Sequence, residues 1–338
     1  MADLARRVQD SFGRSFYLYK QVEQTAVFHN RDFLRCQMTA ISTAAFLDSY
    51  FARIGYQGPV EPSLEVLQQL HLLHPQAIPF ENIAPYRGDS VPLDLEAIVD
   101  KLIHRRRGGY CFEHNTLFLA VLQQMGFNVT PLIARVRWQV PAEVETGLTH
   151  MLLRVEIEGR SWFADVAFGS TTQTAPLEFV LDTPQTTPHG MYRITQAGEV
   201  LSLQFQTRSG WQTVYQYGLA PASQIDFEIG NWYTSTYPQS VFLNSLLISR
   251  TQPGIRELMV NDTYTQRNNA GLSQRHQYTD AAAWAECLQT RLGLTLSREE
   301  AQELFLCVSQ SQDATSELTG GMAGVRPVGW ARPAIPER

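Results

Sequence analysis

The sequence has few cysteines and no long apolar run. Its 338 residues include four cysteines, Cys36, Cys111, Cys287 and Cys307. Their wide spacing fits neither a disulfide framework nor a zinc module. No stretch of about 18 apolar residues is present that could span a bilayer. Because no apolar secretory segment precedes the rest of the chain, we expect a reducing, cytoplasmic setting and no membrane partner.

The sequence also lacks an excess of basic residues. Its formal net charge is −6, with 18% charged and 44% apolar residues, as in ordinary globular proteins. Binding to nucleic acid in general requires a basic face, so we expect no nucleic-acid partner. The run HRRR at residues 104–107 is the exception. We interpret it as a solvated helix end with Arg107 turned inward, and attraction of an anionic cofactor is the alternative. The chain shows no internal repeat, no evident metal site and no phosphate-binding loop.

The most informative segment is the sequence RGGYCFEHN at residues 107–115. Cys111 follows a glycine pair and begins an amphipathic helical pattern that ends near Gly126. A thiol with the ordinary pKa of about 8.5 is only about 3% ionised at neutral pH. The thiolate is the nucleophile, and a helix N-terminus stabilises anions. We therefore predict that Cys111 is a nucleophile rather than a buried structural cysteine.

A reactive cysteine needs a base, and the base needs an orienting group. A predicted strand begins at His150, and a hairpin turn with Gly159 as its first central residue leads to a return strand that carries Asp165. This simple register pairs Asp165 with Arg154, which is an alternative structural partner for the carboxylate. Alternation still places His150 and Asp165 on one face, and a bulge, a longer turn or strand coiling would bring them together. The hairpin supports a Cys–His–Asp triad without proving it.

Two rival interpretations of Cys111 stay open. His114 lies three residues further on and would be near it on a helix, but His114 has no evident orienting carboxylate. A zinc site that combines Cys111 and His114 with His71 and His74 lacks the spacing of zinc modules.

The pattern of elements alone predicts an α+β fold. The predicted segments begin with an extension at 1–40, within which Met38 is a possible true start, and a helical part at 41–127 that carries the nucleophile. An antiparallel β-sandwich or barrel follows at 128–230. Residues 231–310 are predicted to form strands and a final helix from Ser297 to Val308, and residues 311–338 a disordered tail.

Several collinear motifs resemble those of the arylamine N-acetyltransferases. They are residues 78–82 (IPFEN), 107–115, 126–129 (GFNV) with 134–136 (ARV), 149–150 (TH), 165–169 (DVAFG) and 231–242 (NWYTSTYPQSVF). The resemblance runs from about residue 44 to about residue 308. Two departures are Ala167 in place of a glycine and Tyr237 where histidine is frequent. Because Glu81 and Arg107 both lie in these motifs, we also predict a buried ion pair between them that fixes the glycine turn.

The resemblance implies a helical bundle, a central antiparallel β-barrel and a C-terminal α/β lid. It implies acetyl-CoA-dependent N-acetylation of arylamines and arylhydrazines, and O-acetylation of arylhydroxylamines, in xenobiotic metabolism. The route would be ping-pong through a Cys111 acetyl-thioester, with His150 as base and Asp165 as its orienting group. No metal is required. Small molecules, an aromatic amine and an acyl-CoA, would be the partners.

The resemblance also assigns residues around the triad. Phe168 and Phe242 would form walls of the aromatic amine pocket, and Thr149 and Gly169 would contact the acyl donor. Three other functions share these residues. An amide synthase would use a biosynthetic thioester such as a polyketide carrier and ignore free acetyl-CoA. A cysteine hydrolase or transglutaminase-like enzyme would act on peptides or glutamine amides without CoA. A silent binding protein would show no alkylation preference at Cys111.

Overall fold

The computed structural model describes residues 43–318. The chain divides into two compact units, Met1–Phe46 and Leu47–Arg338. The predicted extension at residues 1–40, with Met38 and Cys36, lies outside the described residues. All elements after the first turn of the first described helix belong to the second unit.

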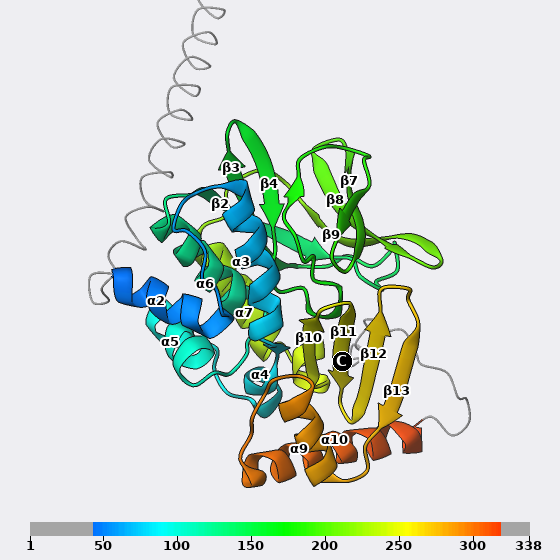
Figure 1. The fold of residues 1–338 in the computed structure, drawn as a ribbon. Coiled ribbons are helices and arrows are strands. Elements are labelled where there is room, and N and C mark those ends of the chain that lie inside the picture. The colour runs from blue at the N-terminus through cyan, green and yellow to red at the C-terminus, as the bar shows by residue number, and fades with distance from the viewer. Residues whose placement is uncertain (1–42, 319–338) are drawn as a thin grey trace, which may run out of the picture. The chain divides into compact units, whose positions relative to one another are not determined.

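Helices dominate the first part of the second unit (Figure 1). They are α2 (Thr43–Ile54), α3 (Leu64–Ala77), α4 (Ile83–Arg87), α5 (Leu95–Val99) with a π-helical turn at Asp100–His104, and α6 (Cys111–Gln124). Ser63 caps α3, because its hydroxyl accepts a hydrogen bond from the Val66 amide at 3.4 Å. The predicted amphipathic character of α6 is wrong. Every residue of α6 from Cys111 to Leu122 is buried, since the helix packs against α5, β2 and β3.

The central part is an eight-stranded sheet in which all neighbouring strands are antiparallel. Its strands are β2 (Asn128–Val136), β3 (Leu148–Ile157), β4 (Arg160–Ala164), β5 (Leu177–Glu178), β6 (Gln185–Thr187), β7 (Gly190–Ala197), β8 (Val200–Thr207) and β9 (Gly210–Tyr217), in the order β5-β4-β3-β2-β9-β8-β7-β6. The two edge strands approach each other, because the Gln185 side chain bonds the Glu178 backbone amide and carbonyl at 2.8 and 2.9 Å. The sheet is therefore a nearly closed barrel around an apolar interior.

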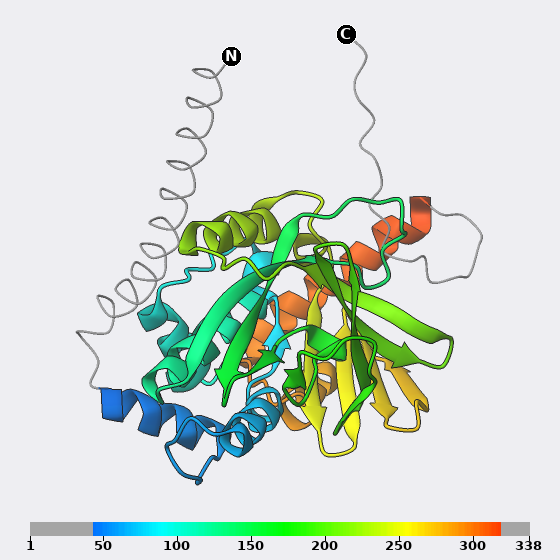
Figure 2. The ribbon, with the colours of Figure 1, turned by 90° about the horizontal axis from the view of Figure 1, so that it is seen from above.

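The last part combines a second sheet with helices. β1 (Phe80–Glu81) joins β10 (Leu247–Gln252), β11 (Ile255–Val260), β12 (Thr263–Asn268) and β13 (Ser273–Gln277) in an antiparallel sheet. Along the chain, α7 (Gln224–Thr236) and α8 (Val241–Asn244) precede β10, and α9 (Ala281–Thr290) and α10 (Arg298–Leu318) follow β13. α9 and α10 pack on this sheet through Trp284, Leu288 and Phe305. Figure 2, the view from above, shows the blue and teal helices to the left of the green strands.

The predicted α+β class is confirmed, and its three-domain division stays a prediction. The boundary proposed at 230/231 falls inside α7, since the strands of the barrel end at Tyr217. The final helix continues to Leu318 instead of ending at Val308, because no glycine or proline interrupts the sequence between these positions. The rest of the predicted tail lies outside the described residues.

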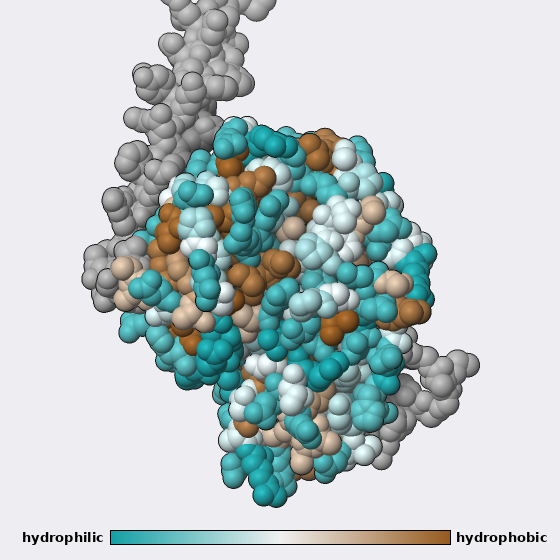
Figure 3. Space-filling view, in the orientation of Figure 1, coloured by the Kyte–Doolittle hydropathy of each residue, from teal (hydrophilic) through white to brown (hydrophobic). Residues whose placement is uncertain are grey.

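The surface is mixed in character. On the face in Figure 3, hydrophilic residues cover most of the area and apolar residues form small, scattered groups. Within residues 43–318, none of the helices combines the length and the apolarity that crossing a bilayer requires.

Candidate active site

Cys111 is the first residue of α6, and a buried ion pair holds the turn before it. The Tyr110 amide donates to Glu113 Oε2 at 3.0 Å, and Lys101 Nζ lies 2.7 Å from Glu113 Oε1. Gly108 allows this turn to pack closely, because a Cβ atom there would lie 2.1 Å from the Pro79 carbonyl oxygen. The chain can therefore deliver Cys111 to the helix start only with glycine at position 108.

The predicted ion pair between Glu81 and Arg107 is wrong. Arg107 Nη1 instead faces Glu300 Oε1 at 3.6 Å, and Glu81 Oε2 accepts the Ile83 amide at 2.7 Å. The buried cation near the glycine turn is Lys101, which stands in a helical stretch that gave no sequence signal for this role.

The hairpin that carries the other two predicted residues has a different register from the predicted one. Its central residues are Glu158 and Gly159, both with positive φ (50° and 77°), as a type I′ turn requires. Arg154 therefore pairs with Phe163, and its Nε lies 3.3 Å from Glu156 Oε1. The predicted pairing of Arg154 with Asp165 is wrong, and the shift moves Asp165 closer to His150.

His150 and Asp165 form a buried pair. His150 Nε2 lies 2.8 Å from Asp165 Oδ2, and both side chains are at most 2% exposed. Asp165 follows directly after the last residue of β4, where the chain leaves the sheet. On its other side, β3 has an irregular register with β2 where Ala134 pairs with His150. These two features bring together residues that regular pairing would separate.

Asn115 connects this pair to the cysteine helix. It lies one turn after Cys111 on α6, on the same face. Its Nδ2 donates to Asp165 Oδ1 at 3.0 Å and to the Met151 carbonyl at 2.7 Å, and its Oδ1 accepts the Val166 amide at 3.2 Å. Sequence reasoning missed Asn115, although its four-residue spacing from Cys111 was the available signal.

Further groups complete the surroundings of Asp165. The Ala167 amide donates to its Oδ1 at 3.0 Å, and the Asp165 amide donates to His71 Nε2 at 3.0 Å. Burial alone would raise the pKa of the Asp165 carboxyl, but His150 and the donors from Asn115 and Ala167 hold it below its usual value. Asp165 is therefore a carboxylate at neutral pH.

The same contacts set the charge of His150. Burial lowers the pKa of an imidazole, yet the charge and hydrogen bond of Asp165 and a hydrogen bond with Cys111 outweigh burial. Together they raise the pKa of His150 to about 10. The ring is thus an imidazolium at neutral pH and can balance the charge of a thiolate.

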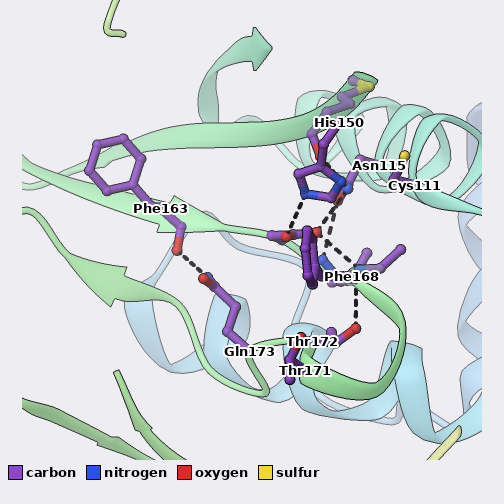
Figure 4. Close-up of polar contacts among 12 residues, drawn as sticks. Cys111, Asn115, His150, Phe163, Phe168, Thr171, Thr172 and Gln173 are labelled. Atoms are coloured by element: carbon purple, nitrogen blue, oxygen red, sulfur yellow. Dashed lines mark hydrogen bonds and ion pairs between the residues drawn. The ribbon is translucent and has the colours of Figure 1, made fainter. Parts of the chain in front are cut away.

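Cys111 meets this ring at the start of α6, as Figure 4 shows. Its Sγ also lies 3.7 Å from the Thr149 carbonyl oxygen, and the residue is 4% exposed. The structure therefore brings the three predicted residues, Cys111, His150 and Asp165, into one buried cluster.

His114 belongs to a separate network. Its Nδ1 lies 2.8 Å from His74 Nε2, its Nε2 lies 3.2 Å from the Pro79 carbonyl, and His74 Nδ1 bonds the Tyr50 hydroxyl at 2.9 Å. Burial, the main cause, lowers the pKa of His114 to about 3, so its ring is neutral. Within the part of the chain that the structure describes, no three His, Cys, Asp or Glu side chains could hold a metal ion.

Aromatic rings surround His150. The Phe168 ring meets it edge to face at a centroid distance of 4.9 Å, and the Tyr215 ring, which the sequence did not single out, also lies at 4.9 Å. Two hydrogen bonds hold the loop that carries Phe168 (Figure 4). The Phe168 amide donates to Thr172 Oγ1 at 2.7 Å, and the Gln173 side chain donates to the carbonyl of Phe163 in β4 at 2.8 Å.

The other two predicted contact residues are Gly169, which follows Phe168 in this loop, and Phe242, which lies beside the glycine turn at Tyr110. Phe242 is half-buried, 5.5 Å from the Tyr110 ring and 6.0 Å from Phe80. Gly169 begins a short 3₁₀ turn with φ of 66°. All four predicted contact residues (Thr149, Phe168, Gly169 and Phe242) thus lie in segments adjoining the triad or Tyr110, and their contacts with substrates stay predictions.

Comparison with known proteins yields one consistent family. A family model described as N-acetyltransferase matches residues 63–301. The arylamine N-acetyltransferase of Escherichia coli is 39% identical over 249 residues, which cover 73% of this chain and 88% of that protein. A Salmonella typhimurium protein named arylamine N-acetyltransferase / N-hydroxyarylamine O-acetyltransferase is 39% identical over 74% of this chain and 89% of its own. The Mycobacterium marinum arylamine N-acetyltransferase in complex with CoA superimposes with a TM-score of 0.75 at 34% identity, over 78% of this chain and 99% of that one.

Proposed function

This chain belongs to the arylamine N-acetyltransferase family, and from this premise we propose that it acetylates aromatic amines through a covalent intermediate on Cys111. Acetyl-CoA is the acyl donor, in keeping with the CoA bound to the Mycobacterium marinum relative. Arylamines and arylhydrazines accept the acetyl group on nitrogen. Arylhydroxylamines accept it on oxygen, as the name of the Salmonella relative indicates for that protein.

The observation that carries the proposal is the 2.8 Å His150–Asp165 pair beside a cysteine at the first residue of a helix. A histidine held by a carboxylate can accept the thiol proton and keep it. The helix N-terminus adds a favourable potential for the anion. A thiol in this setting is a nucleophile poised for acyl transfer.

Before the first half-reaction, Cys111 has passed its proton to His150, which is an imidazolium at neutral pH. The thiolate Sγ then attacks the thioester carbonyl carbon of acetyl-CoA. Backbone N–H groups at the start of α6, which have no partner inside the helix, stabilise the developing oxyanion. The C–S bond to CoA then breaks, and the CoA thiolate takes the proton from His150. One thioester replaces another, so the exchange has little net free energy cost.

In the second half-reaction, the amine nitrogen attacks the acetyl-thioester. The nitrogen loses its proton to His150, the bond to Sγ breaks and the Cys111 thiolate is regenerated. Aromatic amines are weak bases and are mostly unprotonated at neutral pH, so they require little further activation. Phe168, packed edge to face on His150, and Phe242, beside Tyr110, are the proposed walls for the aromatic ring. Thr149 and Gly169 are the proposed contacts of the acyl donor.

The test is the intact mass of the protein after brief exposure to acetyl-CoA alone. We expect a gain of one acetyl group that an aromatic amine then removes, with release of the acetylated amine. Cys111→Ala should show no gain. Cys307→Ala is the matched control, since Cys307 is exposed on α10, and it should acetylate like the parent chain.

Steady-state kinetics give an independent check. A free acyl-enzyme predicts parallel double-reciprocal lines when both substrates are varied. Intersecting lines would argue against it. Absence of the acetyl adduct in the parent chain would remove acetyl-CoA as donor, and adduct loss to water as fast as to amine would indicate a hydrolase instead.

A further inference from the structure

A cavity lined by arginines has none of the three triad residues in its lining. Its volume is about 410 Å³. Its lining residues come from α2, the end of α3, the segment before the glycine turn, β10 and the loop between α9 and α10; they are Arg53, Ala77, Arg105, Arg106, Arg250, Gly293 and Thr295. The lining thus holds four cationic side chains and no acidic one.

The positive charge of this lining is only partly balanced. Glu257 lies opposite Arg250 across β10 and β11 and favours its charged form, although burial, the larger effect, still lowers the pKa of Arg250. Arg105 pairs with Asp100 at 2.7 Å. Among the described residues, no carboxylate forms an ion pair within 4.0 Å of Arg53, Arg106 or Arg250. Burial first, and then the charges of Arg106 and Arg250, lower the pKa of Arg53 to about 10. Arg53 is therefore close enough to Arg106 and to Arg250 to be repelled by both, and an anion would relieve that repulsion.

The two inner arginines are held in place by the backbone. Arg53 is buried and donates to the carbonyls of Leu102 and Ala77 at 2.8 and 2.6 Å. Arg250 donates to the Gln76 carbonyl at 2.6 Å. Gly293 gives Arg250 room, since a Cβ there would lie 2.5 Å from its Nη1. Both guanidinium groups are thus fixed before any ligand binds.

Arg106 adds a different observation. It is exposed and has a φ of 52°, a left-handed conformation that an arginine adopts at an energetic cost. Strained backbone of this kind occurs at ligand-binding positions, where the surroundings impose it. A glycine or asparagine would fit the backbone better, so the arginine is unfavourable locally unless its charge is used.

We propose that this cavity is a binding site for a phosphate-bearing anion. Guanidinium groups match phosphate oxygens with paired hydrogen bonds and carry no acceptor that would repel them. The volume exceeds that of a single phosphate, so the ligand is a diphosphate or a phosphate on a small organic body. Arg105 and Arg106 immediately precede the turn that leads to Cys111, so the occupied site would bear on the position of the nucleophile.

The test is binding of inorganic pyrophosphate to the full chain by calorimetry, at constant ionic strength set with sodium chloride. Two variants, Arg106→Asn and Arg250→Gln, each remove one guanidinium. Loss of charged hydrogen bonds to one phosphate predicts a Kd about 10- to 100-fold higher in each. Arg275→Gln is the charge-matched control, because Arg275 is exposed on β13, and its Kd should equal that of the parent.

Thermal unfolding checks that the variants are folded. Arg106→Asn should be at least as stable as the parent without ligand, because asparagine tolerates the left-handed backbone, while its stabilisation by pyrophosphate is lost. The proposal is overturned if pyrophosphate does not bind the parent chain. It is overturned equally if Arg106→Asn and Arg250→Gln bind as the parent does, or if Arg275→Gln weakens binding as much.

Two sources of phosphate are distinguished by adding CoA. If the site takes the phosphates of CoA, CoA displaces pyrophosphate and both variants raise KM for acetyl-CoA with little change in kcat. If it takes a separate phosphorylated molecule, CoA and pyrophosphate bind together and KM for acetyl-CoA is unchanged. Pyrophosphate binding needs no acyl transfer, so this result is independent of the proposed acetyltransferase activity.

Discussion

Replacement of Asn115 by alanine tests whether one buried amide links the cysteine helix to the His150–Asp165 pair. The side chain is fully buried. Its Nδ2 donates hydrogen bonds to the Met151 carbonyl and to Asp165 Oδ1, and its Oδ1 accepts one from the Val166 amide. Alanine removes all three and takes this partner away from the buried Met151 carbonyl and Val166 amide.

The magnitude follows from the groups left behind. The Met151 carbonyl and the Val166 amide each cost about 1–3 kcal/mol if they stay buried without a partner, so the free energy of unfolding should fall by roughly 3.5–9 kcal/mol once the lost bond to Asp165 is included. Asp165 keeps the Ala167 amide on Oδ1 but loses a charged hydrogen bond worth about 1.5–3 kcal/mol. If that energy orients the carboxylate toward His150, kcat/KM should drop about 10- to 150-fold.

Two measurements separate stability from positioning. Urea unfolding gives the loss in stability, and acetyl transfer is assayed at a temperature where more than about 95% of the variant is folded. Alkylation of Cys111 by iodoacetamide, followed by peptide mass mapping, reports the nucleophile without any substrate. Alkylation of folded Asn115→Ala should be slower than that of the parent at neutral pH.

Thr116→Val provides the matched control. Thr116 is the next residue of α6, is also buried and also contacts Met151, through a 3.6 Å bond to its sulfur. Among the contacts of the described residues, Asp165 receives its amide hydrogen bonds from Asn115 and Ala167 and none from Thr116. We expect a loss of about 1 kcal/mol or less and normal acetyl transfer. If Asn115→Ala keeps normal kcat/KM and alkylation in its folded state, Asn115 does not position Asp165.

Two further predictions concern charge. In the parent chain the pKa of His150 is raised to about 10, so the stability that its charged form contributes is complete below pH 6.5 and is lost as pH rises from 6.5 through 10. In Asp165→Asn, no carboxylate opposes the effect of burial on His150, so the free energies of unfolding of the two proteins in urea should converge toward pH 10. A difference in free energy that widens with pH would contradict the assignment. Lys101→Met leaves the buried Glu113 carboxylate unpaired and should lower the free energy of unfolding by about 3–5 kcal/mol. Arg107→Met breaks only the 3.6 Å pair with Glu300, whose side chains are 22% and 39% exposed, and should lower it by under about 1 kcal/mol. Equal losses of stability in urea unfolding would mean that Lys101 does not hold the turn.

The sequence was sufficient for features that depend on local chemistry. The cysteine at a helix start and the antiparallel strands of the central sheet follow from glycines, helical spacing and alternation, and the structure confirms them. The identities of Cys111, His150 and Asp165 came from motifs and chemistry together. Their meeting in space is a property of tertiary structure, which the structure supplies.

The errors arose where a long-range contact decides the outcome. The predicted hairpin turn lies one residue too late in the sequence. Its prediction has Gly159 as the first central residue, whereas the central residues are Glu158 and Gly159, both with positive φ. One such slip changes the pairing partner of every residue in the hairpin. Helix α6 has an amphipathic sequence pattern but is buried on all sides, since polar residues such as Asn115 find partners across the interior. A single sequence does not reveal those partners.

The choice between two histidines shows why the position of one carboxylate matters more than closeness along the chain. His114 is three residues from Cys111, whereas His150 is on another element. Both rings are fully buried, and burial alone favours the neutral form of each. His114 finds only the neutral ring of His74 and a carbonyl, so its pKa falls to about 3. His150 finds Asp165, and its pKa rises to about 10. Of these two rings, only His150 can hold a proton beside a thiolate at neutral pH, so Asp165 determines which histidine serves Cys111.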